Sequence, residues 1–359
     1  MRELRLMKGN EVIAEAAIRS GCDAYFGYPI TPQSEVMETL MELRPWEATG
    51  MVVLQAESET ASINMVYGGA SCGKRCMTSS SSPGISLMAE GISYLAGAEL
   101  PALIVNVSRG GPGLGTIQPS QADYFQATKG GGHGDYHLIV LAPAAVQEMH
   151  DFVFLGFDLA FKYRNPVMIL ADGVIGQMME KVELAPQRPR WTDEEVVQLN
   201  GSWAVTGKKN RDRHIITSVE LDSLKFENFN KKLVEKYAKV REQEVRYEET
   251  LCDDAEYLIV AYGTSARIGQ KAMELLRTEG IKAGLFRPIT LYPFPEKELA
   301  ARSKQLKGIL TVELSAGQMI EDVKLSVGHQ LHVEHYGRMG GMIYTPNEIT
   351  DAFKKMINR

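Results

Sequence analysis

Two prolines flank a threonine where an apolar run ends, in the stretch FGYPITPQSE. Each proline fixes its own φ angle and restricts the residue before it, so the hydroxyl of Thr31 should be presented in nearly one direction. A turn of this kind can aim a side chain at a ligand. It can also simply end a strand, because proline-rich turns commonly separate secondary-structure elements.

Two carboxylates follow the next apolar run, in the stretch QAESETASINMV. Glu57 and Glu59 fall in what reads as the first turn of an apolar helix, where acidic residues commonly serve as caps and favour the helix dipole. A carboxyl group at the mouth of an apolar helix is also poorly solvated, which is one way to adapt it for proton exchange near neutrality. Both functions are open for either residue.

The third and fourth apolar runs end in TSSSSPGISL and in a long glycine-rich loop that begins SRGGPGLG. Ser82 and Gly84 lie where a helix should begin, and the hydroxyl and amide groups there can bind an anion or only cap the helix. Arg109 comes almost directly after the fourth run. The loop is longer than most in compact domains, and such loops are often functional. Its glycines lack the strand, turn and helix context of a dinucleotide fingerprint.

Metal ligation is a weaker interpretation of the remaining polar residues. His133 and His137 are close in sequence, but no third ligand accompanies them. Asp172 fits the end of a buried strand, and a proline-rich segment separates it from Asn200. The four cysteines are too scattered for an iron–sulfur cluster or a disulfide framework, which suits a reducing compartment. We therefore predict no metal site in this chain.

Six apolar runs separated by helix-like segments must position these side chains. They span residues 23–30, 51–56, 75–80, 102–107, 138–142 and 166–172. Continuous β-branched runs of this kind indicate buried parallel strands in a doubly wound α/β sheet. The carboxyl ends of such strands form the ligand crevice, so the loops that carry Thr31, Glu59 and Arg109 are the ones to inspect.

A second, smaller α/β unit is predicted near the C-terminus. Its strands are expected in YLIVAYG, KAGLFRPIT and GILTVEL, and its last helix starts near TPNEIT. A proline-rich, charged segment and an amphipathic helix that starts near residue 220 separate the two units. The expected boundaries are 1–180 for the first domain, 181–250 for the linker and helix, and 251–359 for the second domain.

Bulk composition excludes several classes of protein. The chain has 359 residues, a net charge of -6 and no basic tract, so nucleic acid is not an expected partner. No apolar run approaches the roughly 18 residues that span a bilayer, and the N-terminus becomes amphipathic too soon for a signal peptide. We expect a cytoplasmic protein without membrane contact.

The order of the motifs resembles that of one family. YPITPQSE, QAESETASINMVYGGA, MTSSSSPGISLMAEGISYLAGAELPALIVNVSRGGPG and KYRNPVMILADGVIGQMME together resemble the α subunit of 2-oxoacid:ferredoxin oxidoreductases. SSSSPGISL and GGPGLGTIQPSQADYFQATKGGGHGD are most similar to the branched-chain type, which acts on 3-methyl-2-oxobutanoate (2-oxoisovalerate). The resemblance implies a thiamine pyrimidine-binding domain followed by a domain similar to the transketolase C-terminal domain. It also implies oxidative decarboxylation of a 2-oxoacid to acyl-CoA with reduction of ferredoxin.

The resemblance also implies roles for three residues. In this family the threonine of the YPITP turn faces the substrate, and the glutamate at the start of the next helix hydrogen-bonds the aminopyrimidine of thiamine diphosphate. An arginine after the fourth strand helps to hold the substrate carboxylate. These positions correspond to Thr31, Glu59 and Arg109. Glu57 is the alternative to Glu59 if the register is shifted.

The chain is expected to hold only part of the cofactor site. Pro29, Ser82 and Gly84 are expected to contact the thiamine, but the acidic GDG segment that binds diphosphate and Mg²⁺ is absent, as is an iron–sulfur motif. The family places both on the β subunit. The resemblance therefore implies β, γ and ferredoxin-like δ subunits as partners, with ferredoxin as electron acceptor and coenzyme A as co-substrate.

The substrate is less narrowly defined than the family. A branched-chain enzyme needs an apolar pocket, whereas 2-oxoglutarate would need a second cation for its distal carboxylate, which Lys129 could supply. A 2-oxoglutarate or pyruvate enzyme is therefore an alternative, and so is a different thiamine enzyme. A non-catalytic nucleotide- or CoA-binding α/β protein is the alternative of another class, because a fold does not fix a function.

Overall fold

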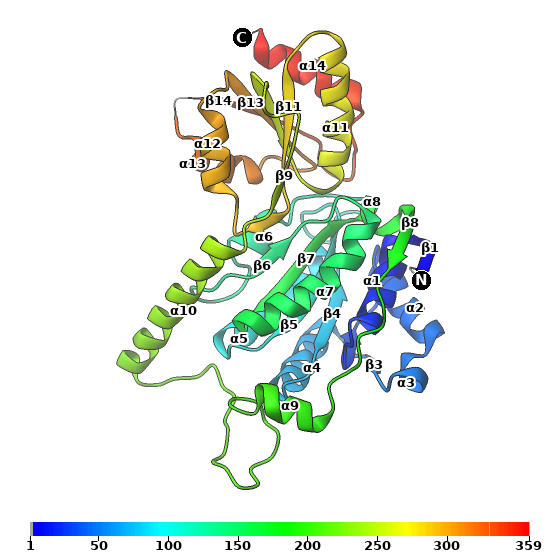
Figure 1. The fold of residues 1–359 in the computed structure, drawn as a ribbon, viewed down its shortest axis with the longest axis vertical. Helices are drawn as coiled ribbons and strands as arrows, with labels where there is room; N and C mark the ends of the chain where they lie inside the picture. The colour runs from blue at the N-terminus through cyan, green and yellow to red at the C-terminus, as the bar shows by residue number, and fades with distance from the viewer. Residues whose placement is uncertain (1–2, 330, 359) are drawn as a thin grey trace.

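The computed structural model describes residues 3–329 and 331–358 (Figure 1). The larger of its two main sheets has seven strands. Its strand order is β12-β6-β7-β5-β4-β2-β3, and every neighbouring pair is parallel except β12 and β6. The strands are β2 (Ala24–Gly27), β3 (Val52–Gln55), β4 (Cys76–Ser80), β5 (Ala102–Ser108), β6 (Ile139–Leu141), β7 (Pro166–Asp172) and β12 (Thr290–Tyr292). The six predicted parallel strands are therefore confirmed, but β3 lies at the edge of the sheet and is mostly exposed, not buried as predicted.

Helices cover both faces of this sheet. The main ones are α1 (Gly9–Arg19), α2 (Ser34–Leu43), α4 (Glu59–Ser71), α5 (Ser82–Gly97) and α7 (Val146–Tyr163). Helix α1 packs against α2 and α7, and α4 packs against α5. Right-handed crossovers in this strand order place the two groups on opposite faces. Every residue of β4, β5 and β7 is consequently buried, which explains the long apolar runs in β5 and β7.

The second unit contains a five-stranded sheet of order β14-β13-β10-β11-β9, parallel except at β9. Its strands are β9 (Tyr247–Thr250), β10 (Tyr257–Ala261), β11 (Ala283–Pro288), β13 (Gly308–Glu313) and β14 (His332–Gly337). Its helices are α11 (Gly263–Thr278), α12 (Glu296–Ser303), α13 (Met319–Val327) and α14 (Pro346–Ile357). The run KAGLFRPIT, which the sequence predicts as one strand, is divided between β11 here and β12 in the larger sheet.

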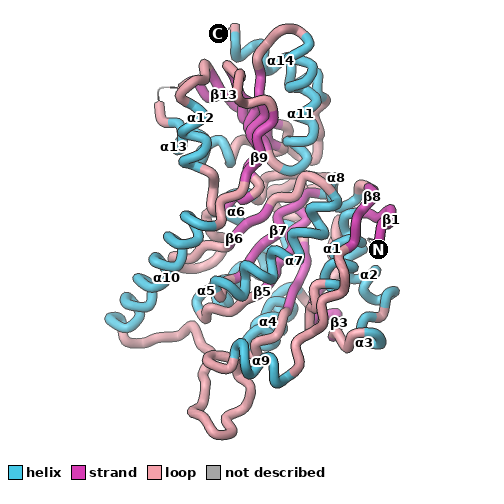
Figure 2. Tube along the Cα trace, in the orientation of Figure 1, coloured by secondary structure: helices cyan, strands magenta, loops and turns pink. Residues whose placement is uncertain are grey.

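The remaining elements connect or flank the two sheets. They are β1 (Glu3–Lys8), which pairs with β8 (Met179–Leu184), and α3 (Pro45–Ala48), α6 (Tyr124–Thr128), α8 (Gly173–Gln177), α9 (Asp193–Asn200) and α10 (Ser223–Gln243). Figure 2 shows a long loop between α9 and α10. Helix α10 buries Leu233, Tyr237 and Val240. Within the described residues, no helix is long and apolar enough to cross a membrane.

The two units are joined through the glycine-rich loop that follows β5. The backbone N–H of Gln121 donates to the carbonyl oxygen of Leu314 at 2.9 Å, and its side-chain Nε2 donates to the carbonyl oxygen of Tyr262 at 2.8 Å. Nearby, the hydroxyl of Tyr124 donates to the carboxylate of Asp322 at 2.5 Å. This loop therefore lies against the carboxyl ends of the second unit's strands, close to the residues predicted to be functional.

Candidate functional site

The turn after β2 is anchored at its proline and leaves its threonine exposed. Side-chain amides from two other elements, Asn10 and Gln177, donate to the carbonyl oxygen of Pro32 at 2.6 and 3.1 Å. Pro32 itself is buried, whereas Pro29 and Thr31 are exposed. The anchored turn therefore presents the threonine at the carboxyl end of β2.

The two candidate glutamates differ in burial. Ser58 is the N-cap of α4, because its Oγ accepts the backbone N–H of Ala61 at 3.2 Å. Glu57 is exposed, but Glu59 is only 6% exposed. Burying a carboxyl group is unfavourable unless something compensates for the lost water. Because Ser58 already caps the helix, capping does not account for the burial of Glu59.

Gly84 lets the first turn of α5 pack directly against Ser80 and Glu59. A Cβ atom at residue 84 would lie 2.0 Å from Oγ of Ser80 and 2.9 Å from Oε1 of Glu59, so a larger side chain does not fit without movement. Among the described residues, the hydroxyls of Thr78, Ser80 and Ser81 are buried without a hydrogen-bond partner. Such groups are rare in folded proteins and indicate an absent partner. Glu59 and the unpartnered hydroxyl of Ser80, both beside Gly84, are therefore the polar groups that could bind the edge of a heterocycle such as an aminopyrimidine.

Arg109 joins the turn after β2 to the glycine-rich loop. Its Nη1 donates to the carbonyl oxygen of Thr31 at 2.9 Å, and its Nη2 donates to that of Leu114 at 3.0 Å. Its Nε is buried and has no partner in the part of the chain that the structure describes. The backbone N–H of Arg109 donates to Oγ of Ser82, the first residue of α5, at 2.9 Å. The fold thus brings together Thr31, Ser82 and Arg109.

A cavity of about 690 Å³ opens beside Arg109, between the two units. Ser82, Arg109 and Asp123 line it from the first unit, and Leu314 and Met339 line it from the second. Sequence reasoning did not identify Asp123, Leu314 or Met339 as site residues. The signal available for Asp123 was its place in the long loop after β5, whereas Leu314 and Met339 carry no local signal.

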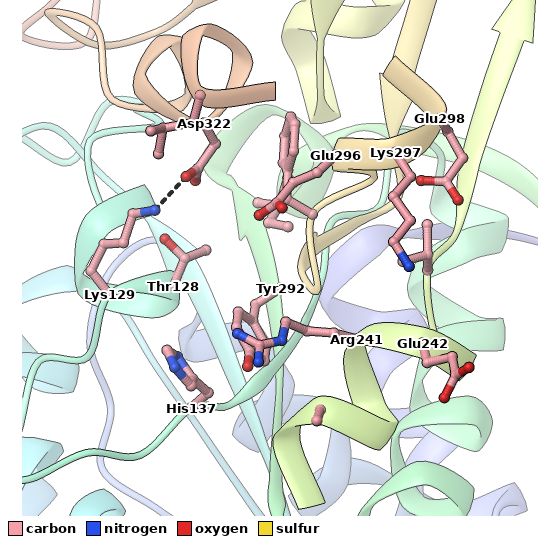
Figure 3. Close-up of a pocket in the computed structure, with 15 residues that line it drawn as sticks. Thr128, Lys129, His137, Arg241, Glu242, Tyr292, Glu296, Lys297, Glu298 and Asp322 are labelled. Atoms are coloured by element: carbon pink, nitrogen blue, oxygen red, sulfur yellow. Dashed lines mark hydrogen bonds and ion pairs between the residues drawn. The ribbon is translucent and has the colours of Figure 1, made fainter. Parts of the chain in front are cut away.

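Lys129 does not lie in this cavity. It lines a separate cleft of about 630 Å³ together with Arg241 and Tyr292, between α6, α10 and the second unit (Figure 3). There its ammonium group forms an ion pair with Asp322, which the close-up marks with a dashed line. Asp322 is only 5% exposed, so the ammonium group of Lys129 already serves to neutralise a buried carboxylate. Lys129 is therefore not positioned to bind a substrate held by Arg109.

The other polar candidates have structural partners. Asp172 is the N-cap of α8, and its carboxylate also accepts the hydroxyl of Thr264 at 2.7 Å. Asn200 donates instead to the carbonyl oxygen of Gly73 at 3.0 Å. His137 stacks on Tyr292 with ring centroids 4.2 Å apart. No group of three or more His, Cys, Asp or Glu side chains among the described residues could hold a metal ion.

Comparisons with known proteins agree with this arrangement. The family model described as pyruvate flavodoxin/ferredoxin oxidoreductase, thiamine diP-bdg (thiamine diphosphate-binding), matches residues 15–247. The model of the pyruvate:ferredoxin oxidoreductase core domain II matches residues 255–349. The chain is 49% identical to the ketoisovalerate oxidoreductase subunit VorB of Methanothermobacter thermautotrophicus over 353 residues, which are 98% of this chain and 97% of that protein.

Two solved structures share the fold. One is a 2-oxoglutarate:ferredoxin oxidoreductase from Magnetococcus marinus with 2-oxoglutarate, coenzyme A and succinyl-CoA bound, which has a TM-score of 0.88 and 27% identity. That match covers 99% of this chain and 66% of the other, so this chain spans only part of it. A split-gene transketolase matches with a TM-score of 0.61 at 14% identity, over 98% of both chains, and shows likeness of fold alone.

These matches confirm the predicted fold, a thiamine pyrimidine-binding domain followed by a transketolase-like C-terminal domain, and they confirm the resemblance seen in the motifs. The first family model alone covers residues 15–247, which is more than half of the chain. The protein therefore belongs to the thiamine diphosphate-binding family of pyruvate flavodoxin/ferredoxin oxidoreductases.

Proposed function

We propose that this chain is the α subunit of a 2-oxoacid:ferredoxin oxidoreductase that converts 3-methyl-2-oxobutanoate to an acyl-CoA and reduces ferredoxin. The 49% identity to a ketoisovalerate oxidoreductase subunit supports this substrate. The observation that carries the proposal is the cavity at Arg109. Among its described lining residues, Arg109 is the sole cationic side chain, and Leu314 and Met339 are apolar.

Glu59 and Gly84 form the part of the chain that fits the cofactor. When bound, thiamine diphosphate supplies the electron sink that allows a 2-oxoacid to lose CO₂. The carboxyl group of Glu59 would share a proton with a ring nitrogen of the aminopyrimidine, as a general acid and base. Gly84 would let α5 lie close to this carboxyl group without displacing it, since a Cβ atom at that position would lie 2.9 Å from Oε1 of Glu59.

Arg109 and Thr31 would hold the substrate carboxylate. A guanidinium group has five N–H donors and binds a carboxylate through two parallel hydrogen bonds. In Arg109, two N–H groups are given to backbone carbonyl oxygens, and its remaining donors include the unpartnered Nε. Thr31 is exposed, and Arg109 contacts the backbone carbonyl oxygen of this same residue. Both groups can therefore act on one substrate.

The composition of the cavity favours an apolar substrate side chain. A second carboxylate, as in 2-oxoglutarate, is costly to bury without a cation. Lys129, the candidate for that cation, is paired with Asp322 in a different cleft. Met339, an exposed side chain that lines the cavity, would instead contact a branched aliphatic group, which gains free energy by leaving water.

The proposed complex contains further subunits. The β subunit would bind the diphosphate and Mg²⁺ and carry an iron–sulfur cluster, and γ and ferredoxin-like δ subunits would complete the path to ferredoxin. We propose domain boundaries at 1–180, 181–250 and 251–359. Two strands cross them, because β9, at residues 247–250, pairs with β11 of the second unit and β12 adds to the first sheet. A cytoplasmic location would suit the four cysteines, which are all free thiols.

The experiment is purification of the chain with its co-expressed neighbours, followed by reduction of a viologen dye with CoA and a panel of 2-oxoacids. We expect 3-methyl-2-oxobutanoate to give the highest kcat/KM and 2-oxoglutarate one of the lowest. A preference for 2-oxoglutarate would overturn the substrate assignment. Absence of CoA-dependent reduction with every 2-oxoacid would overturn the proposed activity and would favour the non-catalytic alternative.

A further inference from the structure

A buried asparagine interrupts the apolar strand β5, which leads to Arg109. Asn106 is 0% exposed, and a buried amide needs hydrogen-bond partners to offset the loss of water. Its Oδ1 accepts the backbone N–H of Ser82 at 3.2 Å, and its Nδ2 donates to Oδ2 of Asp123 at 2.8 Å. Asn106 therefore ties the start of α5 to the glycine-rich loop.

The hydroxyl of Ser82 connects Asp123 to the backbone of Arg109. Oδ2 of Asp123 accepts the hydroxyl of Ser82 at 2.6 Å, and the same Ser82 Oγ accepts the backbone N–H of Arg109 at 2.9 Å. A hydroxyl has one hydrogen and two lone pairs. While its hydrogen points at the carboxylate of Asp123, a lone pair is free for Arg109.

The hydroxyl of Ser82 also has a competing acceptor. The carbonyl oxygen of Arg109 lies 3.2 Å from Oγ of Ser82. A charged acceptor gives the stronger and shorter hydrogen bond, so the carboxylate of Asp123 selects the observed arrangement. Without that carboxylate, Ser82 loses its side-chain tie to the glycine-rich loop, so the hydroxyl oxygen that accepts the N–H of Arg109 is no longer fixed in place.

We propose that Asp123 and Asn106 are positioning residues that act through Ser82 to aim the guanidinium of Arg109 at the carboxylate of a 2-oxoacid. This inference rests on the proposed function of Arg109. Asp123 is half-buried and lines the same cavity as Arg109, so its negative charge also faces the space where an anionic substrate would bind. Because of this placement, a positioning role of Asp123 can be distinguished by experiment from a purely electrostatic role.

The two roles predict opposite effects of Asp123→Asn. Removing a negative charge from the cavity would, by electrostatics alone, lower KM for an anionic substrate. Loss of positioning would raise KM instead, by about tenfold or more, as expected when one hydrogen bond to a charged group is lost. We expect the rise, with kcat changed by less than about threefold and KM for CoA unchanged, since neither depends on the guanidinium direction.

The test uses the assembled complex and four further variants. Asp135→Asn, at an exposed carboxylate elsewhere in the same loop, is the matched control and should leave KM unchanged. Ser82→Ala removes the acceptor of the Arg109 N–H while leaving the Asp123–Asn106 contact intact, and it should reproduce the rise in KM if Asp123→Asn does not assemble. Arg109→Gln alone should raise KM strongly. Adding Asp123→Asn to Arg109→Gln should then raise KM no further, because both changes remove one function.

Each other result is informative. If Arg109→Gln raises KM but Asp123→Asn and Ser82→Ala do not, Arg109 binds substrate and the positioning proposal is wrong. If the effects of Arg109→Gln and Asp123→Asn multiply, Asp123 acts independently of Arg109, and the proposal is again wrong. If Arg109→Gln leaves KM unchanged, the proposed function of Arg109 fails and the positioning role fails with it.

Discussion

Arg109 donates a hydrogen bond of 2.9 Å from its Nη1 to the backbone carbonyl oxygen of Thr31, which lies 78 residues earlier in the chain. The contact connects the end of β5 to the turn after β2, although β4 lies between these strands in the sheet. The two residues proposed to hold the substrate are therefore fixed to each other. A change at Arg109 should disturb both the guanidinium and the turn.

Replacing Glu59 tests the cofactor half of the site. Glutamine keeps the shape of the side chain but cannot exchange a proton, and loss of one general acid or base typically costs 10² to 10⁴ in rate. We expect Glu59→Gln in the assembled complex to lower 2-oxoacid-dependent dye reduction by at least about a hundredfold. Exchange of the thiamine C2 proton, followed by NMR, should slow in parallel.

Glu57→Gln is the matched control for that change, because Glu57 is exposed and two residues away. It should have a much smaller effect on both measurements. Near-normal C2 exchange in Glu59→Gln would contradict the assignment of this chain as the subunit that activates the pyrimidine.

Replacing Arg109 by lysine tests the substrate half. Lysine keeps the charge but cannot make two parallel hydrogen bonds to a carboxylate or reach the carbonyl oxygens of Thr31 and Leu114 together. We expect Arg109→Lys to raise KM for the 2-oxoacid by about tenfold or more, while the affinity for thiamine diphosphate is unchanged. An unaltered KM would indicate that Arg109 serves only to fold the glycine-rich loop.

Gly84→Ala tests the close packing of α5 against Glu59. The added methyl group would lie 2.0 Å from Oγ of Ser80, so the serine or the helix must move. We expect thiamine diphosphate to bind the assembled complex at least about tenfold more weakly, as seen by calorimetry, because each 1.4 kcal/mol of lost contact is a factor of ten. The control is Gly68→Ala on α4, where an added Cβ meets nothing within 4 Å. Equal affinities in both variants would exclude Gly84 from the cofactor site.

The isolated chain should bind thiamine diphosphate weakly, with little dependence on Mg²⁺. Carboxylate ligands are what hold Mg²⁺ against a diphosphate, and the described residues offer no cluster that could bind a metal. Titration calorimetry of the isolated chain, with and without Mg²⁺, checks this. Tight, Mg²⁺-dependent binding would show that the chain holds a complete cofactor site.

The burial of His137 leads us to expect that the stability of the folded protein depends on pH. Burial lowers the pKa of His137 below its ordinary value of 6.5, so the unfolded chain binds more protons than the folded chain as the pH falls below 6.5. The free energy of unfolding should therefore decrease over that range until the folded-state pKa is passed. His137→Asn should reduce this slope in urea titrations, whereas His133→Asn, at an exposed position, should not.

Sequence alone determined the strands and the loops in which the site had to lie. Most of the runs that form β2 to β7 are apolar and bounded by turn residues, and β3, β5, β6 and β7 also contain β-branched residues. These properties depend on residues close together in the chain. The location of Thr31, Glu59 and Arg109 after three parallel strands followed from the same information. The order of the motifs then identified the family.

Only the tertiary structure decided which polar groups are buried and with whom they pair. Glu57 and Glu59 are equivalent in local sequence, but of the two only Glu59 is buried, where it packs against Gly84. Lys129 could have served a second carboxylate until Asp322, 193 residues away, was found beside it. The run after residue 282 was divided between two sheets for the same reason, because pairing between distant strands leaves no periodic trace in either one.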